Sequence, residues 1–321
     1  MLKNIILSIV AASFVSITTL AQSDDPAFEP VLRVIDNNGA MLGANVATVT
    51  DAITMPFGNN RQKAMAIYAW IGKHFSLDPK LVKSEDNRNI LPEQMMRTRK
   101  STTLGLATLF QEMCSQADIR CLIVDGFHKY NMEQIGDPAE EPNYYWNVVQ
   151  LGTTSSDWNY VDVSKACGSL DAKMSMFNAK FSTLYFFPDK TTFNREHYPI
   201  NAAWIMGEAA GSIKDYYNRP LIGPAAYRGH LRGIYPFEGR IKIKPGQLIH
   251  FSYRMNRLKD IKEVTLTKTE GRKVIPAITL PHEINGNEIS FDHVFQQEGE
   301  FETSIFINGE WLLSYWIEVS E

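Results

Sequence analysis

The C-terminal part of the chain alternates apolar and polar residues, and no other feature constrains its fold as strongly. Every second residue is apolar from Ile249 to Met255, and residues 301–307 and 311–319 repeat the pattern. A period of two places alternate side chains on opposite faces, so each stretch predicts a half-buried β-strand. Turn residues separate the strands, at Glu270-Gly271, Asn285-Gly286-Asn287, Gly299 and Asn308-Gly309. Short strands at this spacing are typical of a β-sandwich of about 80 residues, here residues 236–321.

The chain before residue 236 follows a helical period instead. Apolar residues at helical spacing predict one helix with Asn60 as its N-cap and a second from Thr102 to Gln116, capped by Ser101 or Thr102. Strand-like segments follow the second helix, at 120–127, 145–151 and 158–163, with a hairpin turn at 153–156. The stretches expected to be mixed or irregular are 22–60, 78–100 and 165–235. With 321 residues the chain is long enough for two domains, and we expect them at 22–235 and 236–321.

The first 21 residues have the layout of a secretory signal peptide. Lys3 gives a short positive region, an apolar stretch runs from Ile5 to Leu20, and Ala21 precedes polar residues. We expect cleavage near Ala21 and an exported protein, either periplasmic or extracellular. No later segment is apolar over a length that spans a bilayer, so no membrane span is expected after cleavage.

Charge and motif content exclude several classes of partner. The formal net charge is −4 and no basic block is present, which argues against nucleic acid. No glycine-rich phosphate loop and no metal-ligand spacing of histidines occurs, so we expect neither a cofactor nor a metal.

The chain has three cysteines, Cys114, Cys121 and Cys167. An odd number in an exported protein leaves at least one without an intramolecular partner. We expect all three to be small buried side chains. The sequence leaves open whether Cys114 and Cys121 form a disulfide.

The order helix, strand, strand across residues 102–163 matches a papain-type site. There a nucleophile sits at a helix N-terminus, a histidine comes from a neighbouring strand, and an Asp or Asn on the next strand orients it. Six segments in order resemble the transglutaminase-like superfamily, especially its kyphoscoliosis-peptidase-like branch. They are Lys63–Ile71 with Asp78, Gly105–Phe110 with Cys114 and Ile119, Trp146–Val149, Trp158–Asp162 with Ser164, His197–Pro199 with Trp204, and Pro220–Pro224.

This resemblance spans about residues 50–235 and implies an α+β fold. It implies a papain-type domain, with a helix packed on an antiparallel sheet. From the alternating strands, we expect a C-terminal immunoglobulin-like β-sandwich after it. Carried over residue by residue, the family's nucleophile position is Thr103 and its general-base position is Tyr144. Only Asp162, at the third position, keeps the family's residue type, and we expect it to bond Tyr144, Thr103 or backbone N–H groups if it is buried. His197 is expected to be structural.

The two replacements predict a catalytically inactive, transglutaminase-like pseudoenzyme. An internal Thr hydroxyl needs an adjacent base, and a tyrosine with an ordinary pKa near 10 is a poor one. The expected role is then binding of a peptide, polysaccharide or protein, with Tyr145, Trp146 and Trp158 as candidate cleft residues. One alternative is an active cysteine protease or transglutaminase-type enzyme with a displaced nucleophile. Another is an architectural protein that assembles through its β-sandwich.

Overall fold

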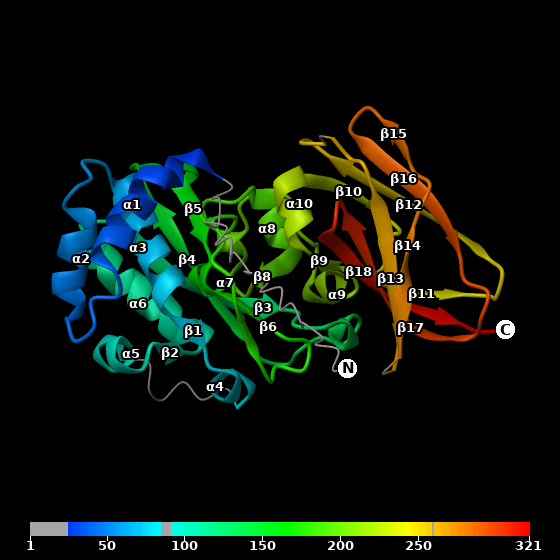
Figure 1. Cartoon of the computed structure of the whole chain (residues 1–321), viewed down its shortest axis with the longest axis horizontal. Helices are drawn as coiled ribbons and strands as arrows, with labels where there is room; N and C mark the ends of the chain where they lie inside the picture. Colours follow the sequence, from blue (N-terminus) through cyan, green and yellow to red (C-terminus); the bar gives the residue numbers. More distant parts are fainter. Residues whose placement is uncertain (1–24, 85–90, 259, 272) are drawn as a thin grey trace, which may run out of the picture.

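The computed structural model describes residues 25–84, 91–258, 260–271 and 273–321. The predicted signal peptide, residues 1–21, lies outside these ranges. One end of the molecule combines helices with a four-stranded sheet, and the other is built from a four-stranded and a six-stranded sheet (Figure 1). Among the described residues, no helix is both long and apolar enough to cross a membrane.

The helical region begins earlier than the sequence pattern predicts. Helices α1 (Glu29–Asn38) and α2 (Val46–Thr54) occupy a stretch expected to be mixed. That expectation was wrong because the two helices span only ten and nine residues, which is shorter than the window over which a helical period is read. Helix α3 (Asn60–His74) confirms the first predicted helix, but its N-cap is Asn59 rather than Asn60.

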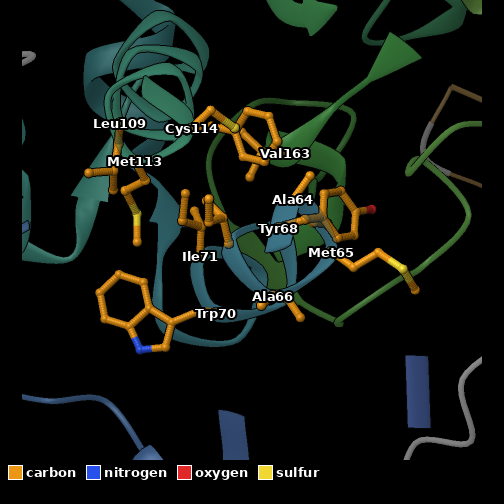
Figure 2. Packing of buried hydrophobic residues seen from close by; sticks show 14 of the residues in the cluster. Ala64, Met65, Ala66, Tyr68, Trp70, Ile71, Leu109, Met113, Cys114 and Val163 are labelled. Carbon is orange, nitrogen blue, oxygen red and sulfur yellow. The ribbon is translucent and has the colours of Figure 1, made fainter. Parts of the chain in front are cut away.

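The second predicted helix is α6 (Thr103–Gln116), with Thr102 as its N-cap. Residues 64–72 of α3 are all buried, because α3 packs between α1, α2, α6 and the short helix α7 (Val163–Cys167). Figure 2 shows Ile71 of α3, Met113 of α6 and Val163 of α7 in this core. The core holds α6 in place, and so fixes where its N-terminus points.

The sheet of the helical region is antiparallel and has the order β5-β4-β3-β8. Its strands are β3 (Arg120–His128), β4 (Tyr144–Gln150), β5 (Trp158–Val161) and β8 (His197–Pro199). The first three confirm the predicted strands, with one correction. The third strand ends at Val161, because Asp162 caps α7 and its Oδ1 accepts a hydrogen bond from the backbone N–H of Lys165 at 3.0 Å.

The two other stretches expected to be irregular contain short elements. Residues 78–100 hold α4 (Pro79–Lys83), α5 (Pro92–Thr98) and the start of β2 (Lys100–Ser101), which pairs with β1 (Ser76–Leu77). Residues 165–235 hold β6 (Gly168–Leu170), β7 (Phe177–Ala179), α8 (Lys190–Glu196), α9 (Ile213–Tyr217), β9 (Leu221–Ile222), α10 (Pro224–Gly229) and β10 (Leu231–Tyr235).

The C-terminal region consists of two sheets that pack face to face (Figure 1). One sheet has the order β10-β12-β16-β15 and the other β11-β18-β17-β13-β14, with β9 also paired to β18. The remaining strands are β11 (Arg240–Ile243), β12 (Leu248–Met255), β13 (Val264–Glu270), β14 (Lys273–Thr279), β15 (Glu283–Asn285), β16 (Glu288–Val294), β17 (Gly299–Ile307) and β18 (Glu310–Val319). Phe251 and Tyr315 meet between the sheets, with ring centroids 5.6 Å apart. Because β9 and β10 precede residue 236, the segment assigned to the first domain also supplies strands to these sheets.

Candidate functional site

Tyr144 and Asp162 meet in the interior of the first region. Tyr144 is the first residue of β4 and its side chain is buried. Its hydroxyl donates a hydrogen bond to Oδ2 of Asp162 at 2.9 Å. Asp162 is itself fully buried, and its other oxygen accepts the α7 capping bond. The expected hydrogen bond between a buried Asp162 and Tyr144 is therefore present.

The environment of Tyr144 makes its phenol a donor rather than a base. Burial, followed by the charge of Asp162, raises the pKa of Tyr144 well above its ordinary value. The phenol therefore stays protonated at neutral pH and keeps its bond to the carboxylate. A general base must instead offer an unprotonated atom to the substrate.

A histidine also reaches Asp162, although it comes from a distant part of the sequence. Nε2 of His197 lies 3.0 Å from Oδ2 of Asp162, and Nδ1 lies 3.3 Å from the carbonyl oxygen of Phe193. The imidazole is stacked on the Phe193 ring at 3.8 Å and is buried. Both ring nitrogens face protein acceptors, so neither is available to take a proton from a substrate, in keeping with a structural role.

Thr103 is the first residue of α6, at the helix N-terminus that the resemblance requires for a nucleophile. It borders a cavity of about 250 Å³ that is also lined by Pro142 and Tyr145. Helix α6 packs on the face of β4 that carries Tyr145 and Asn147, since the Asn147 amide donates to the Ala107 carbonyl at 3.0 Å.

Side chains alternate along a strand, so Tyr144 points away from the face that α6 covers. Accordingly, Tyr144 belongs to a different buried cluster from the core of α6. Among the described residues, no hydrogen bond or ring contact joins Thr103 to Tyr144 or Asp162. The structure thus brings together two of the three predicted positions and places Thr103 at a separate cavity.

The predicted cleft residues do not share one environment. Tyr145 lines the cavity beside Thr103. Trp146 is buried against His197, with ring centroids 5.2 Å apart, and Trp158 is buried against Trp204 at 5.3 Å. Both tryptophans are core residues. Trp146 points away from the face of β4 that α6 covers, and Trp158 packs against Trp204 of a later loop.

Comparison with known proteins agrees with this arrangement. A family model described as the transglutaminase-like superfamily matches residues 47–163, which include α3, α6 and strands β3 to β5. This part of the chain is thus similar to the transglutaminase-like superfamily. The resemblance read from the sequence is confirmed.

The relatives support the resemblance to the kyphoscoliosis-peptidase-like branch. Kyphoscoliosis peptidase of Mus musculus is 26% identical over 187 residues, which cover 58% of this chain and 28% of that protein. Hillarin of Drosophila melanogaster is 23% identical over 199 residues, covering 56% and 23%. Lim and transglutaminase domain protein ltd-1 of Caenorhabditis elegans is 26% identical over 204 residues, covering 59% and 27%. The chain thus matches less than a third of the length of each relative.

No cysteine of the transglutaminase-like domain takes the nucleophile position. Cys114, Cys121 and Cys167 are all buried free thiols, as the sequence suggests. Cys114 lies in the last turn of α6, and burial raises its pKa well above the ordinary value. Burial and the nearby Asp162 likewise raise the pKa of Cys167. A thiolate is disfavoured at both positions.

A buried ionic network beside Tyr144 was not predicted. Oε1 of Glu196 accepts hydrogen bonds from Lys165 at 2.6 Å and His128 at 3.2 Å, and Oε2 accepts one from Tyr227. Burial opposes the charge of Glu196, but Lys165 and His128 outweigh it and hold the pKa well below its ordinary value. Its members lie far apart in the sequence, so no motif spacing could reveal the network. Within the part of the chain that the structure describes, no group of three or more His, Cys, Asp and Glu could hold a metal ion.

Proposed function

We propose that this chain is an exported protein whose transglutaminase-like domain binds a polypeptide segment without catalysing acyl transfer. The observation that carries the proposal is the hydrogen bond from Tyr144 to Asp162. At the position where the family has its histidine, this chain has a neutral donor that is already committed to the carboxylate. Without a base, the hydroxyl of Thr103 stays a weak nucleophile.

The rival activity, acyl transfer from a displaced cysteine, has little physical support. The three thiols are buried, and the pKa of Cys114 and of Cys167 is raised rather than lowered. A reactive cysteine needs access to substrate and an electropositive surrounding that lowers its pKa.

The ligand class follows from the cavity and from the relatives. Two relatives are named as a peptidase, an enzyme that acts on polypeptide. The cavity beside Thr103 keeps the helix N-terminus and an aromatic wall from Tyr145, which suit a peptide carbonyl and an apolar side chain. We assign the two C-terminal sheets to an immunoglobulin-like sandwich, on the support of their antiparallel packing.

The test of non-catalysis is turnover of general substrates. Purified protein is incubated with labelled casein, with and without a primary amine, beside an active transglutaminase and an active cysteine protease. We expect neither cleavage nor amine incorporation above background, and no effect of iodoacetamide. Turnover that iodoacetamide abolishes, and that is lost on replacing one of the three cysteines by alanine, would overturn the proposal.

Export and binding have separate tests. The N-terminal sequence of the protein recovered outside the cytoplasm is expected to start near Gln22. Thr103→Trp, which fills the cavity, is expected to weaken casein binding measured by fluorescence anisotropy, whereas Lys242→Ala on the exposed surface of β11 leaves it unchanged. Equal binding by both variants would move the binding site away from this cavity.

A further inference from the structure

A second cavity, which shares no lining residue with the cavity beside Thr103, is rich in positive charge. It has a volume of about 400 Å³ and lies where the end of α8, the residues after α9 and strand β10 meet. Among the described residues that line it are three arginines, Arg195, Arg219 and Arg232, and one carboxylate, Glu208. The cavity therefore has an excess of cationic groups.

Arg195 is a buried cation without a carboxylate partner. It lies in the last turn of α8 and is 8% exposed. Its one hydrogen bond goes from Nη2 to the backbone carbonyl of Arg232 at 2.5 Å, and its Nε has no acceptor. Within the described ranges, no Asp or Glu lies at ion-pair distance from Arg195. A buried charge is costly unless an opposite charge accompanies it.

In the part of the chain that the structure describes, Arg219 also lacks a carboxylate partner, whereas Arg232 has one. The guanidinium of Arg219 lies over the ring of Phe237, 4.2 Å from its centroid, and its Nε also lacks an acceptor. Arg232 is held by two hydrogen bonds to Asp189, at 2.6 and 2.7 Å. The fold thus neutralises one of the three arginines with a carboxylate and leaves the other two facing the cavity.

The electrostatics of Arg195 agree with the geometry. Burial first, and the charge of Arg219 second, lower the pKa of Arg195 to about 10. Glu208 and Asp189 act in the opposite direction without reversing the shift. Asp215 likewise raises the pKa of Arg219 without offsetting its burial. The nearby carboxylates therefore do not compensate the cluster.

We propose that this cavity binds an oxyanion group, a carboxylate, sulfate or phosphate, between Arg195 and Arg219. Guanidinium groups bind such anions through forked, charge-assisted hydrogen bonds. Phe237 is 45% exposed beside Arg219 and offers an apolar surface to the part of the ligand that carries the anion. The site lies outside the region of Tyr144 and Asp162, so it goes beyond the proposed function and does not depend on it.

The experiment is calorimetric titration with inorganic sulfate, inorganic phosphate and acetate, each at constant ionic strength. The wild type is expected to bind sulfate or phosphate saturably at one site. Arg195→Gln and Arg219→Gln should each weaken binding by about tenfold or more, because each removes a charge-assisted hydrogen bond. Arg33→Gln is the matched control, since Arg33 is an exposed arginine on α1, a helix that does not line the cavity. Its affinity should equal that of the wild type.

Each of the other outcomes also either supports or overturns the proposed anion site. Saturable acetate binding with no sulfate or phosphate binding would identify a carboxylate site within the same proposal. No saturable binding of any of the three anions would overturn it. Equal binding by wild type, Arg195→Gln and Arg219→Gln would show an adventitious ion only. If Arg195→Gln fails to fold, Arg219→Gln decides, because Arg219 is half-buried and its loss leaves Arg195 in place.

Discussion

Two clusters of buried charge in this molecule contrast sharply in how they are balanced. Around Asp162, each carboxylate oxygen accepts a hydrogen bond from the protein, from Tyr144 and His197 on one oxygen and from a backbone N–H on the other. Around Arg195, two guanidinium groups face a cavity and have no carboxylate partner among the described residues. The first cluster is complete without a ligand, and the second is not.

This difference distinguishes buried charges that stabilise the fold from buried charges that can bind a ligand. A buried charge whose hydrogen bonds are all made within the protein stabilises the fold and has nothing left to offer a substrate. A buried charge left without a partner lowers stability unless something outside the chain supplies that partner. The region that corresponds to the family's catalytic site is of the first kind, which fits a domain that has kept its fold and lost its chemistry.

The largest loss of stability is expected when the carboxylate of Glu196, which joins α7, α8, α10 and β3, is removed. Glu196→Ala leaves Lys165 and His128 buried without their anion and removes the acceptor for Tyr227. Breaking a buried pair from one side costs about 3–5 kcal/mol. Urea unfolding should show this loss. Glu310→Ala, which breaks a surface pair with Arg228, is the control and should cost about 1 kcal/mol or less; equal losses in the two variants would contradict the completeness of the buried cluster.

A smaller effect is expected from removing a single donor to Asp162. Tyr144→Phe keeps the ring and deletes the hydroxyl that bonds Oδ2. Loss of one partner of a buried hydrogen bond costs about 1–3 kcal/mol. Tyr235→Phe, on an exposed tyrosine, should leave the unfolding free energy unchanged. A Tyr144→Phe variant as stable as the wild type would mean that this bond does not hold the site together.

The dependence of stability on pH sharpens the comparison further. Burial, with the charge of Lys165, lowers the pKa of His128 to about 4, although Glu196 opposes the shift. As the pH falls, His128 takes up a proton in the unfolded chain, where its pKa is about 6.5, but stays neutral in the folded chain. Stability is therefore full above about pH 6.5 and falls as the pH drops toward 4.

Between pH 7 and 4.5, the unfolding free energy of His128→Gln should decrease less than that of the wild type, by on the order of 1 kcal/mol. Unfolding curves measured over this range test the difference. His293, whose pKa is also lowered to about 4 by burial and by Lys268, contributes to the same window. Its replacement by glutamine serves as a comparison in the C-terminal sheets. A wild-type curve that is flat over this range would show that neither histidine stays neutral in the fold.

The smallest effect is expected at the arginine cavity. In buffer free of multivalent anions, Arg195→Gln should change the unfolding free energy by less than about 1 kcal/mol, because the lost carbonyl hydrogen bond is offset by relief from burial and from the repulsion of Arg219. With saturating sulfate or phosphate, the wild type should become the more stable of the two. A large loss on substitution in anion-free buffer would instead make Arg195 a structural residue.

Local patterns predicted the elements that place Tyr144 and Asp162. The helix from Thr103 has a clear apolar stripe, the strands β4 and β5 are rich in aromatic and β-branched residues, and the family resemblance gave the positions within them. Only the pairing of β3 with β8, which sets His128 opposite His197, carries His197 toward Asp162, and no local pattern encodes that register.

The arginine cavity was beyond local patterns for the same reason. Arg195 lies in the short helix α8, Arg219 follows the short helix α9, and Arg232 lies in β10, a strand of the C-terminal sheets. These elements lie in the stretch where the sequence shows no sustained period. Only tertiary packing brings the three arginines together around one cavity.

The central proposal is that Thr103 and Tyr144, at the positions of the family's nucleophile and base, do not form one catalytic site, and thiol reactivity at position 103 tests it most directly. Thr103→Cys places a thiol at the N-terminus of α6, and the double variant with Tyr144→His adds an imidazole that Asp162 can orient. The rate of alkylation by iodoacetamide is measured against pH for both variants, with the wild type as the background of buried thiols. Because Tyr144 points away from the face of β4 that α6 covers, we predict equal alkylation rates and the same apparent thiol pKa in the two variants. A double variant that reacts faster near neutral pH, with a lower apparent pKa than the single variant, would show that the two positions form one site and would contradict the account.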